Sequence, residues 1–437
     1  MPKVYVLGAG VDATQGIGMP LNNELLPRIT QFLETDKGKE IDGKLRAIYP
    51  QLRFRFSAFI EKAIDDMARN FNDEVVTIKE RVSQELEDND QLTEEQRNMG
   101  ALITRLMDKV HDMADRAALD DETERLITVV FGHEMVHDDS IIDLHKVVFS
   151  GTFQTVVKLL LTRSLETPND AILRHMNKNF LDIEKLLVQY FVGFFIGKAY
   201  DIKVYSYISW MLWAYLLHCE QEIISEQGDD IANLPVYSQI EQESTIINFN
   251  YTTFGQMFVN SHHGSAIHYF HGSLLDYLDI KRNHVFINEL NSFKDLDICR
   301  FVDESLSPNV DFNSDPQHIT IPSFMPPVTI KPVMSQKNIE TWYKSFECLK
   351  NANEIIIIGY SFNSSDEHFN GMLRDCREIP LVVVDTNVEA IKRMLQPIYN
   401  IQPNDYVLEH IQGHDAYVAR GIKIIKAQAH EIDYTQL

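Results

Sequence analysis

The sequence predicts an α/β protein in which a parallel sheet is interrupted by a large helical insertion. Short, continuous apolar runs, typical of buried parallel strands, occur at residues 3–8 and again only after residue 243. From about residue 22 to residue 240, apolar residues recur instead at intervals of three and four, which is the helical pattern. Strands and helices then alternate, which favours a Rossmann-like doubly wound parallel sheet.

The sheet domain is therefore predicted to be discontinuous. We expect it to comprise residues 1–24 and 241–437, and residues 25–240 to form an all-helical insertion that serves assembly or regulation. With 437 residues, of which 44% are hydrophobic, the chain is long enough for two or three ordered domains.

The predicted strands after the insertion are short and bounded by polar turns; their sequences are STIINFN, AIHYFHG, NEIIIIGYS and IPLVVVDTN. Helical spacing follows at residues 338–353, with Asn338 as a candidate N-cap, and again from residue 388 until Pro397. Between Asp276 and Pro327 the sequence is polar, rich in proline and without periodicity. We expect a long irregular loop there, of the kind that often covers a site.

Residues 186–218 are strongly apolar and aromatic, but Lys198, Asp201 and Lys203 divide them. Neither half reaches the roughly 18 residues that a membrane-spanning helix needs, so no membrane association is expected. Buried helices are the better interpretation, packed in a core, which we favour, or in an oligomer interface. Scattered cysteines and an N-terminus that begins a strand indicate a cytoplasmic protein.

The charge balance limits the possible partners. The chain has 64 acidic and 40 basic residues, a formal net charge of -24. Nucleic-acid affinity depends largely on Lys and Arg, so we expect no direct nucleic-acid binding by the isolated chain. An anionic nucleotide would also be repelled, and its phosphates would need local backbone N–H groups and helix N-termini.

A glycine loop follows the first predicted strand. Gly8, Gly10 and Ala13 have the G-x-G-x-x-A spacing that lets a backbone approach a pyrophosphate. The ribose-binding acid expected on a second strand is missing, because helices follow. The loop is therefore either a nucleotide site, which its strand context favours, or a tight structural turn.

Two polar side chains end later strands. Asn250 closes the run IINFN and His271 closes HYFH, so both are expected at the carboxyl edge of the sheet, where open α/β sheets bind ligands. An amide can orient a water molecule or ribose hydroxyls, and an imidazole can act as general base. Taken singly, Asn250 is more often a turn cap and His271 more often a structural histidine; their order with the glycine segments favours a shared site.

A short metal-binding pattern competes with this interpretation. His133, Glu134 and His137 form HExxH, which on a helix binds zinc in metallopeptidases. The pattern is weak in a chain with 16 histidines, and no third ligand follows at the metzincin position. We expect no metal.

The ordered motifs resemble sirtuin-like proteins. They are Gly8-Ala9-Gly10, a loop ending in Gly18-Met19-Pro20, Asn250 in NFNYT, His271-Gly272-Ser273, Gly359-Tyr360-Ser361 with Asp366, and Asp385 closing VVVD. The chain is most similar to bacterial anti-phage sirtuin-like NADases, and in size and helical insertion to the subunit that partners a HerA-type ATPase. The motifs cover somewhat under half of the chain. NFNYT is also reminiscent of the AbiH abortive-infection family.

The resemblance implies specific roles. Gly8, Ala9 and Gly10 would line the NAD phosphates, and Asn250 and His271 would serve the nicotinamide ribose as catalytic residues. Gly359, Ser361 and Asp385 would contact the adenosine side. Asp12, Pro20 and Gly272 belong to the same expected NAD-contacting set.

Departures from the deacetylating sirtuins are equally informative. The four-cysteine zinc module is absent, and the GIP-D-F-R loop is reduced to Gly18-Met19-Pro20. Thr252 stands where those enzymes have Asp, and Asp12 stands where they have Ser. The lost zinc module argues against an acetyl-peptide substrate.

We therefore expect an enzyme that hydrolyses NAD to nicotinamide and ADP-ribose and depletes NAD during phage infection. Such an activity needs control, so a homo-oligomer and a HerA-type ATPase partner are expected. The competing hypothesis is a non-catalytic sensor that binds NAD or ADP-ribose; a nuclease is disfavoured by the acidic charge.

Overall fold

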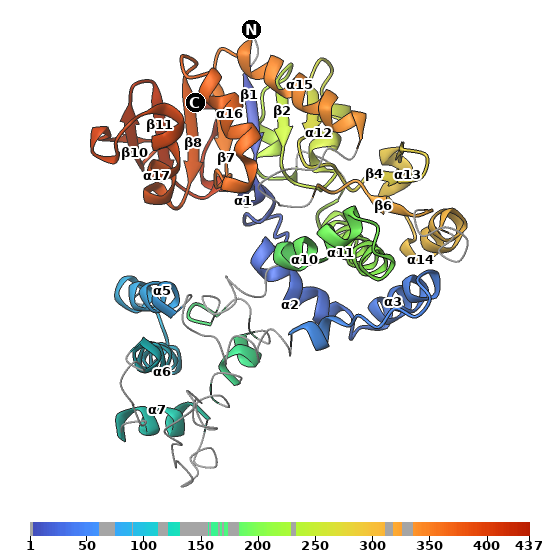
Figure 1. The fold of residues 1–437 in the computed structure, drawn as a ribbon. Coiled ribbons are helices and arrows are strands. Elements are labelled where there is room, and N and C mark those ends of the chain that lie inside the picture. Colours follow the sequence, from blue (N-terminus) through green and yellow to red (C-terminus); the bar gives the residue numbers. More distant parts are fainter. Residues whose placement is uncertain are drawn as a thin grey trace. The chain divides into compact units, whose positions relative to one another are not determined.

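Figure 1 shows the computed structural model of the protein. It describes residues 3–60, 75–89, 91–111, 121–131, 156, 159–164, 167, 170–173, 183–228, 233–310, 318–325 and 335–437. These residues form a mixed α/β structure with a mostly parallel eight-stranded sheet and many helices. The chain divides into two compact units, each of which has most of its residue contacts within itself. The first, which contains the sheet, is residues 1–21, 32–52 and 186–437; the second is residues 22–31 and 53–185.

Six neighbouring strands of the main sheet are parallel. Their spatial order is β3 (Ala266–Tyr269), β2 (Thr245–Asn248), β1 (Val4–Leu7), β7 (Ile355–Ile358), β8 (Leu381–Asp385) and β11 (Ile422–Lys426). Two further strands, β10 (His414–Ala419) and β9 (Val407–Ile411), continue the sheet in antiparallel orientation. The five predicted strands are confirmed as β1, β2, β3, β7 and β8. The order reverses between β1 and β7, which is compatible with a Rossmann-like fold.

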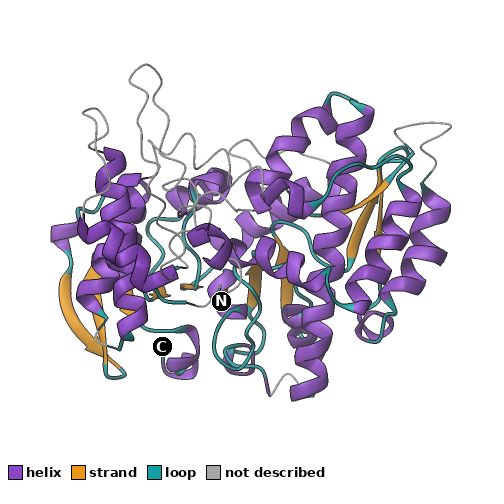
Figure 2. Cartoon of the chain, turned by 90° about the horizontal axis from the view of Figure 1, so that it is seen from below, coloured by secondary structure: helices purple, strands orange, loops and turns teal. Residues whose placement is uncertain are grey.

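Helices cover both faces of this sheet, as Figure 2 shows. One face packs against α15 (Gln336–Lys350), α16 (Glu367–Asp375) and α17 (Val388–Tyr399), and alternate strand residues such as Val6 and Ile357 form the core there. On the other face α12 (Phe254–Ser261) lies so close to β3 that a Cβ on Gly255 would be 2.3 Å from Ile267 Cδ1. Burial on both faces explains why the strands are almost continuously apolar.

Two predicted helix ends are wrong. The N-cap of α15 is Ser335, and Asn338 is the third helical residue, whose side chain accepts the Ser335 N–H at 3.0 Å in a capping box. Helix α17 also continues past Pro397 to Tyr399. The proline removes a bond only in the last turn, and burial of Tyr399 in the core holds that turn before Asn400 ends it in the left-handed conformation.

The expected irregular loop between Asp276 and Pro327 is also largely wrong. A three-stranded antiparallel sheet forms from β5 (His284–Ile287), β4 (Asp276–Asp279) and β6 (Thr320–Pro322), with α13 (Leu290–Lys294) and α14 (Ile298–Phe301) between them. Each element has only three to five residues, too few for a clear periodicity, and pairing between distant residues stabilises them.

The described part of the expected insertion is helical. Its helices are α2 (Asn22–Phe32), α3 (Asp36–Ile48), α5 (Val75–Asp88), α6 (Glu94–His111), α7 (Asp121–Phe131), α10 (Ile183–Phe195) and α11 (Ala199–Gln227). The predicted domain limits stay a prediction. Contacts group residues 32–52 and 186–240 with the sheet, but they do not test which segments fold independently.

Helix α11 lies in the core of the sheet-containing unit. Trp210 and Trp213 are each 1% exposed, and their indole N–H groups donate to Thr320 O at 2.7 Å and to Leu274 O at 2.8 Å. The favoured interpretation of this apolar segment as core is therefore confirmed for α11. Of the helices in the described ranges, none has the length and apolar character required to cross a bilayer.

Candidate functional site

The carboxyl ends of four parallel strands are level with one another. Backbone pairing aligns the residues that end these strands, namely Leu7, Asn248, Tyr269 and Ile358. One or two residues beyond them come the predicted site residues Gly8, Asn250, His271 and Gly359. The segments that sequence analysis assigned to one site therefore do meet at one edge of the sheet, next to the point where the strand order reverses.

The glycine loops at this edge pack directly against each other. Gly8 N–H donates to Ile358 O at 2.9 Å, and Gly10 N–H donates to Gly359 O at 3.0 Å. A Cβ on Gly8 would be 2.4 Å from Gly359 O, and Gly359 itself has φ +59. The close approach of the loops that follow β1 and β7 is therefore sufficient to require glycine at these positions. Helix α1 (Ala9–Asp12) is a single turn on which Ala9 is exposed; the NAD contacts of this loop stay a prediction.

Asn250 connects the β2 loop to the β1 loop. Its side chain is held between them, because Nδ2 donates to Gly8 O at 3.0 Å while its backbone N–H donates to Asn248 Oδ1 at 3.0 Å. The residue is 8% exposed. Its amide is therefore oriented by the glycine loop before any ligand binds.

His271 lies beside a buried carboxylate. Its Nε2 atom is 2.8 Å from Asp366 Oδ1, an ion-pair distance, although the approach is not aligned for a hydrogen bond. The Tyr360 hydroxyl donates to Asp366 Oδ2 at 3.1 Å. Burial, and then the Asp366 charge, raises the pKa of Tyr360 well above its usual value, so this hydroxyl remains a donor. A carboxylate held in this way can orient an imidazole.

The His271 ring also has an apolar wall. Phe249 packs edge-on against it with ring centroids 5.0 Å apart. Asp366 itself is 5% exposed and ends a 3-10 turn (Ser364–Asp366) beyond β7. The imidazole and its carboxylate are thus largely screened from solvent, which strengthens the electrostatic interaction between them.

The two departures from the sirtuin pattern contact each other. The Thr252 hydroxyl donates to Asp12 Oδ2 at 2.5 Å, and the Tyr237 hydroxyl donates to Asp12 Oδ1 at 2.6 Å. Burial raises the pKa of Asp12 to about 6, while the bonds from Thr252 and Tyr237 act in the opposite direction. Asp12 is thus a buried carboxyl that joins the glycine loop to the Asn250 loop.

Three other predicted site residues follow α1, follow β7 or end β8. Pro20 is half-buried in the loop beyond α1, and Ser361 is exposed after β7. Asp385 ends β8, where its Oδ1 accepts the Asn387 N–H at 2.8 Å; burial raises its pKa and this bond lowers it. Ser361 is therefore accessible to a ligand, whereas one oxygen of Asp385 stabilises its own turn.

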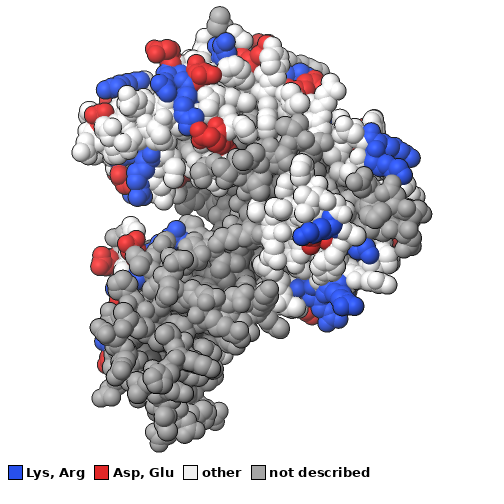
Figure 3. Space-filling view, viewed as in Figure 1, with Lys and Arg blue, Asp and Glu red and all other residues white. Residues whose placement is uncertain are grey.

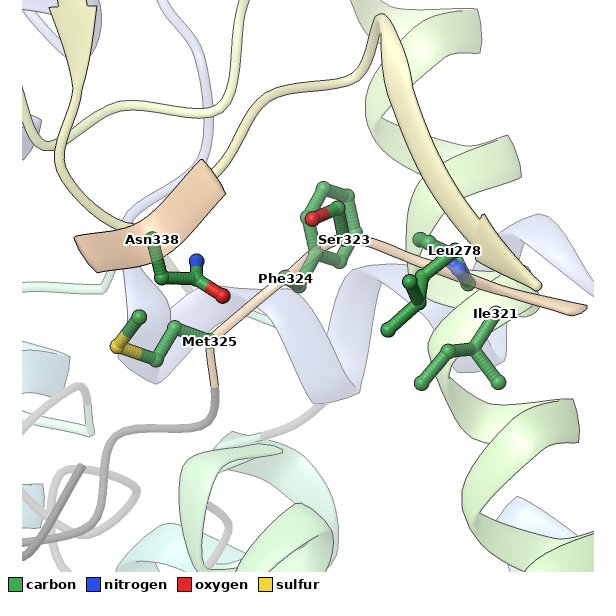
Figure 4. A pocket seen from close by; sticks show the side chains of 7 residues that line it. Leu278, Ile321, Ser323, Phe324, Met325 and Asn338 are labelled. Carbon is green, nitrogen blue, oxygen red and sulfur yellow. The ribbon is translucent and has the colours of Figure 1, made fainter. Parts of the chain in front are cut away.

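Gly272 is fixed by a backbone crossing. It has φ +88, and a Cβ there would be 1.8 Å from Ser323 O, so no other residue fits. Beside it, Met325 N–H donates to His271 O at 2.9 Å. Strand β6 and the residues that follow it supply much of the small pocket in Figure 4, which is lined by Leu278, Ile321, Pro322, Ser323, Phe324, Met325 and Asn338. A mostly apolar pocket thus adjoins the backbone of His271.

Charged side chains of both signs lie on the surface of the described residues. On the face drawn in Figure 3, Lys and Arg lie interspersed with Asp and Glu over the described part of the chain. The expectation that local N–H groups and helix N-termini would hold phosphates at the site stays a prediction.

The competing zinc pattern cannot be compared with this site. His133, Glu134 and His137 lie outside the described residues. Within the described ranges, no cluster of three or more His, Cys, Asp or Glu side chains is arranged to hold a metal ion.

Three residues whose side chains contact the loops of the site have no role assigned to them in the sequence analysis. Asp366 enters the sequence analysis only as part of a motif. Tyr237 and Glu220, whose carboxyl accepts the Thr253 N–H at 2.9 Å, do not enter it. The signal for Glu220 is present, since it is an acid in the strongly apolar sequence of α11, where it is 1% exposed. Tyr237 has no such signal, because it approaches Asp12 only through the tertiary fold.

In comparisons with protein-family models, with curated proteins and with solved structures, no match to this chain was found.

Proposed function

We propose that the chain is a sirtuin-like NAD⁺ glycohydrolase, built on a Rossmann-like doubly wound sheet, that cleaves NAD to nicotinamide and ADP-ribose. One observation carries this proposal: Asn250, anchored on Gly8, and His271, paired with Asp366, lie on loops that end adjacent strands at the carboxyl edge. In open α/β sheets, nucleotides bind at this edge where the strand order reverses.

The chemistry assigns each residue a task. The bond between the ribose C1′ and the nicotinamide nitrogen breaks, nicotinamide leaves as a neutral molecule, and a water oxygen bonds to C1′. Positive charge develops on the ribose as this occurs. Asn250 would orient the ribose hydroxyls or the water, and His271 would accept the water proton and pass it to solvent. Asp366 would keep the imidazole in the required orientation.

The biological setting follows from the resemblance alone. We propose NAD depletion in anti-phage defence, in the cytoplasm, by a homo-oligomer that a HerA-type ATPase partner regulates. Residues 25–240 would contribute to this assembly.

A second candidate is a sensor that binds NAD or ADP-ribose without turnover. The observation that favours it is that the N–H groups of the glycine loop already have partners in the protein. Gly8 and Gly10 donate to Ile358 O and Gly359 O, and Asn250 is 8% exposed. A site closed in this manner would need to open before catalysis.

Nicotinamide release separates the two candidates. Purified protein, alone and with a HerA-type ATPase as the proposed partner, is incubated with NAD, and nicotinamide and ADP-ribose are quantified by chromatography while binding is followed by calorimetry. Turnover in either condition is expected from the enzyme. Binding of NAD or ADP-ribose with no nicotinamide release in both conditions would favour the sensor and overturn the enzyme.

A further inference from the structure

One face of α11 touches three loops of the candidate site. Trp213, Glu220 and Gln227 are spaced by seven residues, so they lie on the same side of this helix. Each forms a hydrogen bond to a different loop at the carboxyl edge of the sheet. The helix therefore contributes more than apolar core to this unit.

Trp213 holds the loop that follows His271. Its indole N–H donates to Leu274 O at 2.8 Å, and the N–H of Leu274 donates to Tyr251 O at 2.8 Å. Tyr251 directly follows Asn250 in the chain. A displacement of α11 at Trp213 would thus move the His271 loop relative to the Asn250 loop.

Glu220 holds the Asn250 loop itself. Its two carboxyl oxygens accept both hydrogen-bond donors of Thr253, the backbone N–H at 2.9 Å and the hydroxyl. The preceding residue, Thr252, donates to Asp12 beside the glycine loop. Gln227, two helical turns further on, donates its side-chain N–H to Gly16 O in the loop that follows α1.

The charge of Glu220 makes this arrangement unusual. Glu220 is 1% exposed, and burial raises its pKa to about 7. The two hydrogen bonds from Thr253 lower this pKa. The charge of Asp12 on α1 raises it, and that of Lys294 on α13 lowers it. Tyr269 on β3 also lies within the field of Glu220. A buried carboxyl is expensive to desolvate, and here its two oxygens are used to fix one residue of the Asn250 loop.

We propose that the Trp213, Glu220 and Gln227 face of α11 is a positioning element of the active site, which sets the distances between the Asn250, His271 and Gly8 loops. The proposal rests on the proposed NAD cleavage for its catalytic consequence. It implies that the site is incomplete without α11, and that anything which shifts α11 alters turnover through these three loops.

The test compares Glu220→Ala with Glu220→Gln. Ala removes both acceptors of Thr253, whereas Gln keeps an acceptor for its N–H and offers a donor to its hydroxyl. The matched control is Glu226→Ala, an exposed glutamate on the same helix. Amide hydrogen exchange of the Thr253 and Leu274 N–H groups is measured on the full chain, together with kcat and KM for NAD cleavage.

Glu220→Ala is expected to speed exchange at Thr253 and Leu274 at least about tenfold. It should also lower kcat at least about tenfold while KM changes less than about threefold, because the contacts that bind NAD remain. Glu220→Gln and Glu226→Ala should stay within about threefold of the unaltered protein in every quantity. Unchanged exchange and unchanged kcat in a folded Glu220→Ala variant would overturn the proposal, as would equal losses in the Ala and Gln variants.

A variant that fails to fold and a protein that does not cleave NAD can each be distinguished from failure of the proposal. If Glu220→Ala does not fold, Trp213→Phe decides, since it keeps an aromatic ring in the core and removes only the donor to Leu274 O; the proposal then requires a lower kcat, and an unchanged kcat contradicts it. If the unaltered protein releases no nicotinamide under any condition, the proposed function fails, while the exchange rates still show whether Glu220 fixes the loop.

Discussion

Replacing Asp12 by Asn should remove a specific pH dependence from the stability of the sheet-containing unit. Asp12 is 3% exposed, and burial raises its pKa from 3.8 to about 6 in the folded chain. A folded-state pKa above the unfolded value means that the folded chain prefers the protonated carboxyl. This contribution to stability is complete below about pH 3.8 and is lost as the pH rises through about 6.

The magnitude follows from the same values. The pKa difference of about 2 pH units corresponds to about 3 kcal/mol, at about 1.4 kcal/mol per unit. Asn cannot ionise and resembles the protonated carboxyl in shape, so the stability of the Asp12→Asn variant does not depend on pH through this position. The free energy of unfolding of Asp12→Asn, minus that of the unaltered protein, should therefore rise by about 2 kcal/mol between about pH 4 and pH 7.

Urea titration followed by tryptophan fluorescence measures this difference. All three tryptophans, Trp210, Trp213 and Trp342, belong to the sheet-containing unit, so the signal reports on that unit. Asp375→Asn, at an exposed position, controls for loss of a surface charge. A difference that stays flat across this pH range, or that falls as the pH rises, would refute the assignment of Asp12 as a buried carboxyl whose pKa is raised in the folded chain.

Two further predictions concern single contacts. Gly272→Ala should lower the free energy of unfolding by at least about 3 kcal/mol, because its Cβ would overlap Ser323 O. The control Gly413→Ala, at φ +85 with no atom within 4 Å, should lower it by only about 1 to 2 kcal/mol. Equal losses of the two variants in urea titrations would contradict the close approach of Ser323 to Gly272. Asp366→Asn should lower kcat for NAD cleavage about 10- to 100-fold with KM nearly unchanged, because His271 loses its orienting carboxylate; an unchanged kcat and pH profile would remove Asp366 from the mechanism.

The central strands were predictable because their burial is simple. The runs that became β1, β7 and β8 are buried on both faces, so continuous apolar sequence was a sufficient signal. The same rule located the carboxyl edge, since the polar residue that ends each run must lie there. This is why Asn250 and His271 could be named from sequence before the strand order was known.

The outer strands of the main sheet and the short strands between Asp276 and Pro327 were not predictable in this way. The edge strand β9 is mostly exposed, and β11 contains both buried and exposed residues. Their stability depends on pairing, of β9 with β10 and of β11 with β10 and β8, rather than on composition alone. The short strands between Asp276 and Pro327 depend on pairing in the same manner.

Contacts between distant segments were also invisible in the sequence. Asp12 and Thr252 each looked like an isolated departure from a family pattern, yet their side chains form one hydrogen bond. Glu220 reaches Thr253 only because α11 packs against the loop that follows β2. Sequence patterns identify which residues end a strand, but the partner of a buried polar group is set by the tertiary fold.

The initial rate of nicotinamide release from NAD tests the central claim most directly. It is compared among the unaltered protein, Asn250→Ala, His271→Ala and His410→Ala, the last an exposed histidine with 70% of its side chain accessible. The account predicts release by the unaltered protein and by His410→Ala at equal rates, and a loss of at least about 100-fold in Asn250→Ala and His271→Ala, each still folded by tryptophan fluorescence. Release at the unaltered rate by either site variant would contradict it.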